Sequence, residues 1–263
     1  MTSSAIDIAA RRLAAAWRSG EPGAPVRDLI AAGDVDAAYA VQDIGTRARL
    51  DAGGRLVGRK IGLTSPAVQK QLGVDQPDYG MLFDDMDVPL GAEIAFSRVH
   101  QPKIEAEVAF ILSQDLNDAR LTTADILSAI DYAVASFEIV GSRIAAWDIT
   151  LVDTVADNAS SGLFVLGHEP RRLREFDVVN AQMTMTCAGK QVSQGVGSAC
   201  LGSPVSALLW LARVMVERGR PLARGDLVLS GALGPMVAVA PGDRFEAVID
   251  GLGRVTASFG AAA

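Results

Sequence analysis

The chain has few cysteines and histidines, and this scarcity limits the metal and redox chemistry that it can support. Only Cys187 and Cys200 are cysteine, and they do not form a CxxC pair. Neither a disulfide framework nor a thiolate zinc site is expected, and a reducing, cytoplasmic compartment fits best. The two histidines, His100 and His168, lie far apart and without HExxH spacing. Any metal should therefore be held by oxygen ligands.

Clusters of positive charge and long apolar runs are also lacking. The 24 Lys and Arg residues face 31 Asp and Glu residues, and the formal net charge is -7. No Lys/Arg stripe exists, so nucleic-acid binding is not expected as the main role. Apolar stretches such as 227–229 and 236–240 are far shorter than the roughly 20 residues that span a bilayer, so no membrane anchor is expected.

The residues that are present suit a globular domain of mixed structure. Apolar positions recur at helical spacing in residues 5–18 and 36–50, with a Gly/Pro-rich loop between them. Residues 55–63 and 103–112 are predicted strands, and the Gly/Pro/Asp-rich segment 73–85 is predicted to be a long ordered loop. The sequence thus predicts a helical N-terminal region followed by an α+β body.

The C-terminal half combines helical and strand patterns. Residues 121–140 contain a Thr N-cap candidate, a helical run and then an apolar strand, and 204–218 is a predicted buried helix. Short predicted strands follow, which suggest an antiparallel sheet or roll: 226–233, 235–242, 243–251 and 253–260. The third glycine of a GxGxxG fingerprint is missing after Gly195 and Gly197, which disfavours a nicotinamide enzyme.

Three acidic residues stand inside apolar strand patterns. Glu105 and Glu107 are two residues apart and should project from the same face of a strand, whereas Glu138 is isolated in the run AVASFEIVG. An arbitrary ExE pair is more often a solvated strand face, but the apolar flanks oppose that interpretation. Like carboxylates about 4 Å apart repel by roughly 4 kcal/mol at an effective dielectric near 20, so a shared site requires a cation. Magnesium or manganese suits such ligands and leaves room for a bidentate substrate such as a 2-keto acid.

Other polar residues have two interpretations that spacing does not separate. Lys60 lies between apolar neighbours and is either a site residue or a surface lysine. Asp78 in DQPDYG is either a site residue or the cap of a turn before Gly80. The segment VADNASSG, residues 155–162, either supplies site residues or merely forms a hydrogen-bonded turn.

Several long segments together resemble a known family. GRKIGLTSPAVQKQLGVDQPDYG, QPKIEAEVAFIL, FEIVGSRIAAWDITLVDTVADNASSG and LSGALGPMVAVAPGDRFEA are similar to segments of the 2-keto-4-pentenoate hydratases, within the fumarylacetoacetate hydrolase superfamily. The resemblance covers roughly residues 36–260 in family order, and the first 35 residues carry little of it.

The resemblance implies an α+β fold, a mixed β-roll or sandwich wrapped by helices. It also implies a helical N-terminal region (1–50), a catalytic β-roll domain (51–263), a Mg²⁺ or Mn²⁺ ion and assembly into a homo-oligomer. Its site residues would divide into metal ligands, catalytic residues and substrate-binding residues: Glu105, Glu107 and Glu138; Lys60 and Asp78; Ser160, Asp157 and Gly162.

The resemblance further implies hydration of 2-hydroxypenta-2,4-dienoate, a small unsaturated 2-keto acid, to 4-hydroxy-2-oxopentanoate in the meta-cleavage degradation of aromatics. The nearest alternative is 4-oxalocrotonate decarboxylase, which has the same metal triad. Carbon–carbon hydrolysis is a weaker alternative, because it normally needs a His-assisted water and only His100 and His168 are available. A non-catalytic partner subunit of a pathway enzyme is the alternative from a different class, and association with other meta-cleavage enzymes is a further expectation.

Overall fold

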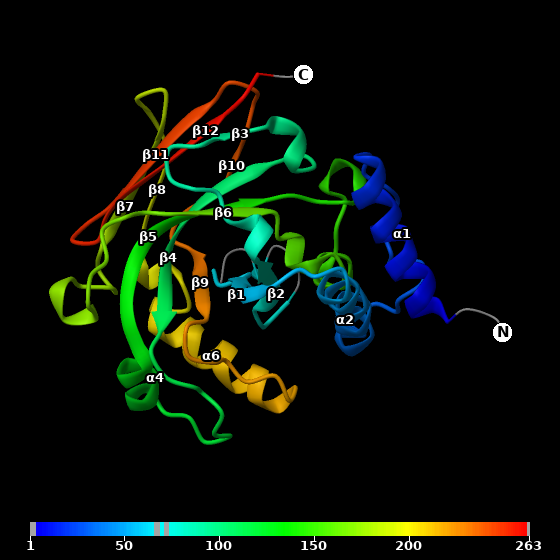
Figure 1. The fold of residues 1–263 in the computed structure, drawn as a ribbon, viewed down its shortest axis with the longest axis horizontal. Coiled ribbons are helices and arrows are strands. Elements are labelled where there is room, and N and C mark those ends of the chain that lie inside the picture. The colour runs from blue at the N-terminus through cyan, green and yellow to red at the C-terminus, as the bar shows by residue number, and fades with distance from the viewer. Residues whose placement is uncertain (1–3, 66–68, 71–73, 262–263) are drawn as a thin grey trace.

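Two β-sheets and the helices around them make up the structure, a computed structural model that describes residues 4–65, 69–70 and 74–261 (Figure 1). The larger sheet has the order β2-β1-β9-β4-β5-β6, and β10 pairs with the start of β4. Its strands are β1 (Leu56–Gly62), β2 (Asp78–Phe83), β4 (Lys103–Leu112), β5 (Ile130–Val140), β6 (Leu163–Leu166), β9 (Leu227–Ala232) and β10 (Val237–Ala238).

The smaller sheet has the order β3-β12-β11-β7-β8 and covers one side of the larger sheet at β5 and β6. Apolar side chains that alternate along β11 and β12, such as Phe245, Val255 and Phe259, are buried. The strands are β3 (Glu93–Ile94), β7 (Gln182–Cys187), β8 (Lys190–Val196), β11 (Arg244–Ile249) and β12 (Gly253–Phe259). The two sheets thus share a core, in which β11 and β12 pack against β5.

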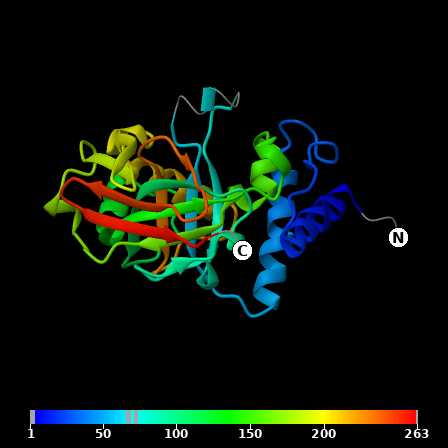
Figure 2. The same ribbon diagram turned by 90° about the horizontal axis from the view of Figure 1, so that it is seen from above.

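The N-terminal helices α1 (Ala5–Ser19) and α2 (Val35–Asp51) pack together beside the sheets (Figure 2). Ser4 and Asp7 form a capping box at the start of α1, and Gly20 ends the helix in the left-handed conformation. Helix α2 packs against α5 (Leu151–Ala156), which leads to the short helical turn at Asn158–Ser160. Both predicted N-terminal helices are thereby confirmed to within a residue.

Two further helices lie against the larger sheet. Thr122 caps α4 (Thr123–Ala129), as the sequence predicted, and α6 (Pro204–Glu217) packs on α4, β9 and β1. By length and composition, Gly197–Glu217 is the one helical segment of the described residues that could cross a membrane, with a mean hydropathy of 1.6. Its Leu208 and Leu211 are fully buried, as in the core helix of a globular protein.

The α+β class and the family fold are confirmed, but one local prediction was wrong and another is confirmed only in part. The predicted loop 73–85 contains strand β2, because the six residues Asp78–Phe83 are all buried and pair with β1; residue 73 itself lies outside the described residues. The C-terminal strands are not purely antiparallel, since β1 runs parallel to β9 and β3 parallel to β12.

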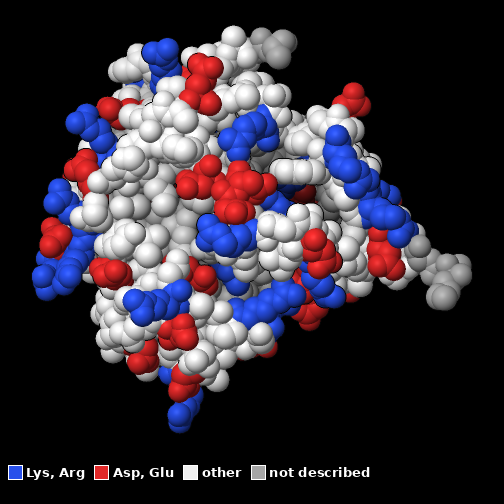
Figure 3. Space-filling view, viewed as in Figure 1, with Lys and Arg blue, Asp and Glu red and all other residues white. Residues whose placement is uncertain are grey.

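On the face shown in Figure 3, Lys/Arg and Asp/Glu side chains are interspersed.

Candidate metal centre

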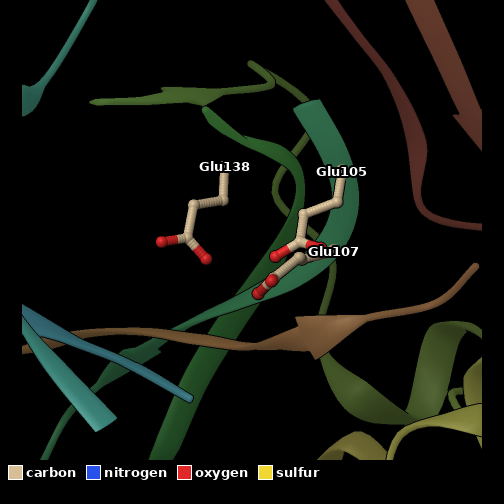
Figure 4. A group of neighbouring side chains, drawn as sticks. All are labelled: Glu105, Glu107 and Glu138. Carbon is tan, nitrogen blue, oxygen red and sulfur yellow. The ribbon is translucent and has the colours of Figure 1, made fainter. Parts of the chain in front are cut away.

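Strands β4 and β5 bring the three glutamates together. In this antiparallel pair Glu105 lies directly opposite Glu138, and Glu107 follows two residues later on the same face of β4. One carboxylate oxygen from each residue lies within 4.8 Å of the others, and the three side chains converge on one space (Figure 4). The predicted convergence of these acids is therefore confirmed, whereas their role as metal ligands stays a prediction.

Three of the six carboxylate oxygens of this cluster lack a hydrogen-bond partner among the described residues. Glu105 is 8% exposed and the other two are fully buried. Within the described residues, one oxygen of Glu107 and both oxygens of Glu138 have no hydrogen-bond partner, although Lys60 forms an ion pair with Glu138. Burial, together with the neighbouring carboxylates, raises the pKa of Glu105 to about 8, and it raises the pKa of Glu107 and Glu138 as well. Three buried acids with unpaired oxygens fit a hard divalent cation, which would neutralise them and use their lone pairs.

The remaining oxygen of Glu107 is fixed by the backbone of β9. Gly231 donates its N–H to Glu107 Oε2 at 2.7 Å. Gly231 has a φ of +111°, and a Cβ there would lie 2.4 Å from Thr64 Oγ1. Glycine is therefore required for the close approach that orients this carboxylate.

Lys60 and Asp78 lie at the edge of the acid cluster. Lys60 Nζ forms an ion pair with Glu138 Oε1 at 3.3 Å, and both side chains are buried. Burial alone would lower the pKa of Lys60, but Glu138 and the other carboxylates raise it above its usual value. Lys60 is thus a buried cation and not the surface lysine that the sequence left open.

Asp78 faces this group from β2, opposite Gly62 of β1. Its Oδ1 has no hydrogen-bond partner among the described residues, and burial raises its pKa although Lys60 opposes the shift. Because Asp78 lies within a strand, it does not cap a turn before Gly80. Strand β2 therefore delivers a carboxyl group whose position and raised pKa suit proton transfer.

A cavity of about 700 Å³ opens beside the acids. Lys60, Asp78 and Glu105 form part of its lining, together with Thr154 and Ser160. Ser160 Oγ lies 3.1 Å from Thr154 Oγ1 and is buried. The structure thus brings four of the sequence-predicted site residues to one cavity, and Glu107 and Glu138 complete the acid cluster with Glu105. The cavity has the size of a small-molecule site.

Asp157 and Gly162 occupy different surroundings, although they lie close to Ser160 in sequence. The carboxylate of Asp157 accepts hydrogen bonds from the backbone N–H and the guanidinium of Arg143, and it is 4% exposed. A Cβ on Gly162 would lie 2.4 Å from the carbonyl oxygen of Ile139, so this glycine permits close packing of two backbones. Neither residue lines the cavity beside the acids. Their predicted role in substrate binding remains untested.

A second cavity, of about 570 Å³, lies between α1, α2 and the body of the protein. Its lining is largely apolar and includes Trp17 and Phe83, with Arg49 and Arg143 close to these rings. Asp157 in this lining is paired with Arg143. The cavity therefore lacks a cluster of unpaired carboxylates such as the one beside Glu105.

Sequence reasoning missed Lys103, Gly231 and Arg143. Lys103 lines the cavity and lies two residues before Glu105 on the same strand, so strand periodicity could have identified it. Gly231 and Arg143 act through tertiary contacts, for which the sequence offers no signal.

Comparison with known proteins identifies the family of this chain. The family described as fumarylacetoacetate (FAA) hydrolase C-terminal matches residues 62–259. The chain belongs to this family. Within it the chain belongs to the 2-keto-4-pentenoate hydratases, since it is 60% identical to "2-keto-4-pentenoate hydratase 1" of Dechloromonas aromatica over 96% of each chain. It is also 61% identical to "TodF product hydratase" of Pseudomonas putida, over 97% of this chain and 95% of the relative.

A solved structure of this superfamily is closely similar. It is 4-oxalocrotonate decarboxylase from Pseudomonas putida G7 complexed with magnesium and adipate, at 33% identity and a TM-score of 0.92. The similarity covers 97% of both chains. This fumarylacetoacetate hydrolase family member therefore shares its fold with a metal-bound enzyme, including the N-terminal helices.

Proposed function

We propose that this protein is a metal-dependent hydro-lyase that converts 2-hydroxypenta-2,4-dienoate to 4-hydroxy-2-oxopentanoate in the meta-cleavage degradation of aromatics. One observation carries this proposal: the buried cluster of Glu105, Glu107 and Glu138 adjoins a small-molecule cavity that also holds Lys60 and Asp78. Full-length likeness to hydratases supports the choice of reaction.

The three glutamates would hold a Mg²⁺ or Mn²⁺ ion, because their unpaired oxygens and buried charge match a hard divalent cation. When bound, the ion supplies Lewis-acid polarisation of the substrate's 2-oxygen and offsets its developing negative charge. Gly231 keeps one oxygen of Glu107 in a fixed direction, which preorganises the site.

The protein's own residues would move the protons. Hydration of the dienol adds a proton at C5, a water oxygen at C4 and a second proton at C3 when the ketone forms. The 2-hydroxyl and the attacking water each lose one proton, which balances the two that are added. Asp78 lines the cavity and its buried Oδ1 has no partner within the described chain, so we assign it to proton transfer or water activation. Lys60 would stabilise negative charge on the substrate, and Ser160 would donate its hydroxyl to the carboxylate end.

The decarboxylase is the second candidate, because its solved structure shares this fold at 33% identity. Purified protein with Mg²⁺ should be assayed with 2-hydroxypenta-2,4-dienoate and with 2-oxo-3-hexenedioate. We expect disappearance of the dienoate and formation of 4-hydroxy-2-oxopentanoate. Release of carbon dioxide from the dicarboxylate, without hydration of the dienoate, would replace the hydratase by the decarboxylase.

A non-catalytic partner subunit is the remaining alternative. It predicts neither turnover nor bound metal, and calorimetric titration with Mg²⁺ and Mn²⁺ separates it from both enzymes.

We further propose a cytoplasmic homo-oligomer that associates with other meta-cleavage enzymes. Within each chain, residues 1–50 would form a helical region beside a catalytic domain of residues 51–263. Sedimentation analysis of the full chain tests the oligomer.

A further inference from the structure

We infer that Lys103 is a further substrate-binding residue, a cation that receives the carboxylate of the 2-keto acid and is positioned by Trp147. This inference rests on the proposed function and identifies a group that binds the substrate at that site. The observations that carry it are the charges of the cavity lining and the way in which Lys103 is held.

The charged groups around the cavity have an excess of negative charge, which a further cation would offset. Glu105, Glu107, Glu138 and Asp78 supply four negative charges when ionised, whereas Lys60 and a divalent ion supply three positive charges. An anionic substrate increases this excess, and like charges in a partly desolvated cavity repel strongly. Substrate binding therefore favours a second protein cation in the cavity wall.

Lys103 fits this requirement. Lys60 and Lys103 are the Lys and Arg residues of the described cavity lining, and Lys60 is already paired with Glu138. Lys103 forms no ion pair within 4.0 Å among the described residues. Its positive charge is therefore available to an anion that enters the cavity.

The strand register places Lys103 beside the acid cluster. Lys103 and Val140 are direct partners on β4 and β5, and Glu105 and Glu138 form the next pair on the same face of the sheet. Two residues along a strand correspond to about 7 Å, which is comparable to the length of a five-carbon acid. A substrate near the glutamates would thus lie within reach of the Lys103 ammonium.

Trp147 holds this ammonium at the cavity wall. Lys103 Nζ lies 4.1 Å from the centre of the Trp147 ring, and the indole N–H donates to the carbonyl oxygen of Gln101 at 2.9 Å. Ala146 and Trp147 have φ values of +58° and +53°, a conformation that L-residues rarely adopt in succession. The fold thus keeps the ring beneath the cation despite backbone strain.

The test compares the affinities for two ligands, of which only that for the 2-keto acid should fall. Lys103→Met should weaken the binding of 2-oxopentanoate at saturating Mg²⁺ by about 10- to 100-fold, the usual effect of a lost charge-assisted hydrogen bond. It should leave Mg²⁺ affinity without the acid unchanged or slightly higher, because a positive charge near Glu105 is removed. Calorimetry measures both constants.

Matched variants test whether loss of the positive charge at Lys103 causes the weaker binding. Lys103→Arg should retain most of the affinity for 2-oxopentanoate, and Lys190→Met, an equal charge change at an exposed position on β8, should have no effect. Trp147→Leu should weaken 2-oxopentanoate binding less than Lys103→Met does, because the cation remains but loses its support. Thermal melting shows whether each variant is folded.

Unchanged 2-oxopentanoate affinity in folded Lys103→Met, with or without a change in Mg²⁺ affinity, would overturn this inference. Failure of the proposed function has a different signature, because the unmodified protein would then not hydrate 2-hydroxypenta-2,4-dienoate. Turnover in the unmodified protein together with unchanged binding in the variant rejects the role of Lys103 alone.

Discussion

Two groups of buried carboxylates differ in how their oxygens are satisfied. Glu105, Glu107 and Glu138 converge with few donors, whereas Asp153 and Asp157 are surrounded by them. Burial raises the pKa of both Asp157 and Glu107, so burial alone does not separate the two groups. The two groups differ instead in the number of hydrogen bonds that their carboxylate oxygens accept.

The aspartates connect parts of the chain that are distant in sequence. Asp153 accepts from the backbone N–H groups of Val26 and Arg27 at 2.8 and 3.0 Å, and so attaches the segment after α1 to helix α5. Asp157 performs a similar function with Arg143 after β5. Buried charges that are fully paired in this way hold a fold together.

The glutamates have fewer partners, since Gly231 donates to one oxygen of Glu107 and Lys60 pairs with Glu138. Burial of three close carboxylates therefore disfavours their ionised form without a cation. Buried acids thus occur in two settings: the aspartates position segments of the chain, and the glutamates leave oxygens free, as the proposed metal site would need. Substitutions in each group should therefore have opposite signatures in stability and in activity.

The largest effect is expected for Glu107→Gln. Loss of this carboxylate should abolish Mg²⁺ binding in calorimetry and lower kcat/KM by about 10²–10⁴-fold, because the Lewis-acid contribution amounts to several kcal/mol. Metal-free stability should stay equal or rise, since repulsion is removed. Glu217→Gln, an exposed position at the end of α6, is the control. Retained Mg²⁺ binding and turnover would remove Glu107 from the site.

Asp78→Asn should separate catalysis from metal binding. Turnover should fall by about 10²–10⁴-fold, the usual contribution of a positioned acid or base, with Mg²⁺ affinity largely intact. Asp75→Asn, exposed in the segment before β2, should behave like the unmodified protein. Equal turnover in both variants would exclude Asp78 from proton transfer.

Asp157→Asn should instead lower stability. Removal of one partner leaves the Arg143 guanidinium buried and unpaired, which typically costs about 3–5 kcal/mol in the free energy of unfolding. Urea denaturation measures this loss, and Asp51→Asn at an exposed position is the control. A raised KM with unchanged stability would favour the predicted substrate-binding role over the structural one.

The effect of pH is the smallest for a change of one pH unit. The metal-free folded state holds a proton on Glu105 up to about pH 8, whereas the unfolded chain releases it near the usual glutamate pKa of about 4.3. Because the folded state binds more protons in this interval, stability should fall as pH rises, by at most about 1.4 kcal/mol per pH unit for this group. Saturating Mg²⁺ should flatten the slope in thermal melts. A slope that is equal with and without Mg²⁺ would contradict a metal at these glutamates.

Strand 103–112 and the helices near residues 5–18 and 36–50 could be predicted from the sequence, because side-chain periodicity is a local property. The same periodicity placed Glu105 and Glu107 on one face. The segment 73–85 was predicted wrongly, since its Gly, Pro and Asp content indicates a loop and only pairing with β1 makes Asp78–Phe83 a strand.

The sequence by itself thus determined the α+β class and the family, and it identified the acidic residues in apolar strands as candidate site residues. Only the tertiary structure decided that Glu138 lies opposite Glu105 and that Asp78 faces Lys60. It also decided that Asp157 forms an ion pair with Arg143. The physical reason is that strand register and ion pairing join residues far apart in the chain, so the free energy that fixes them has no local signature.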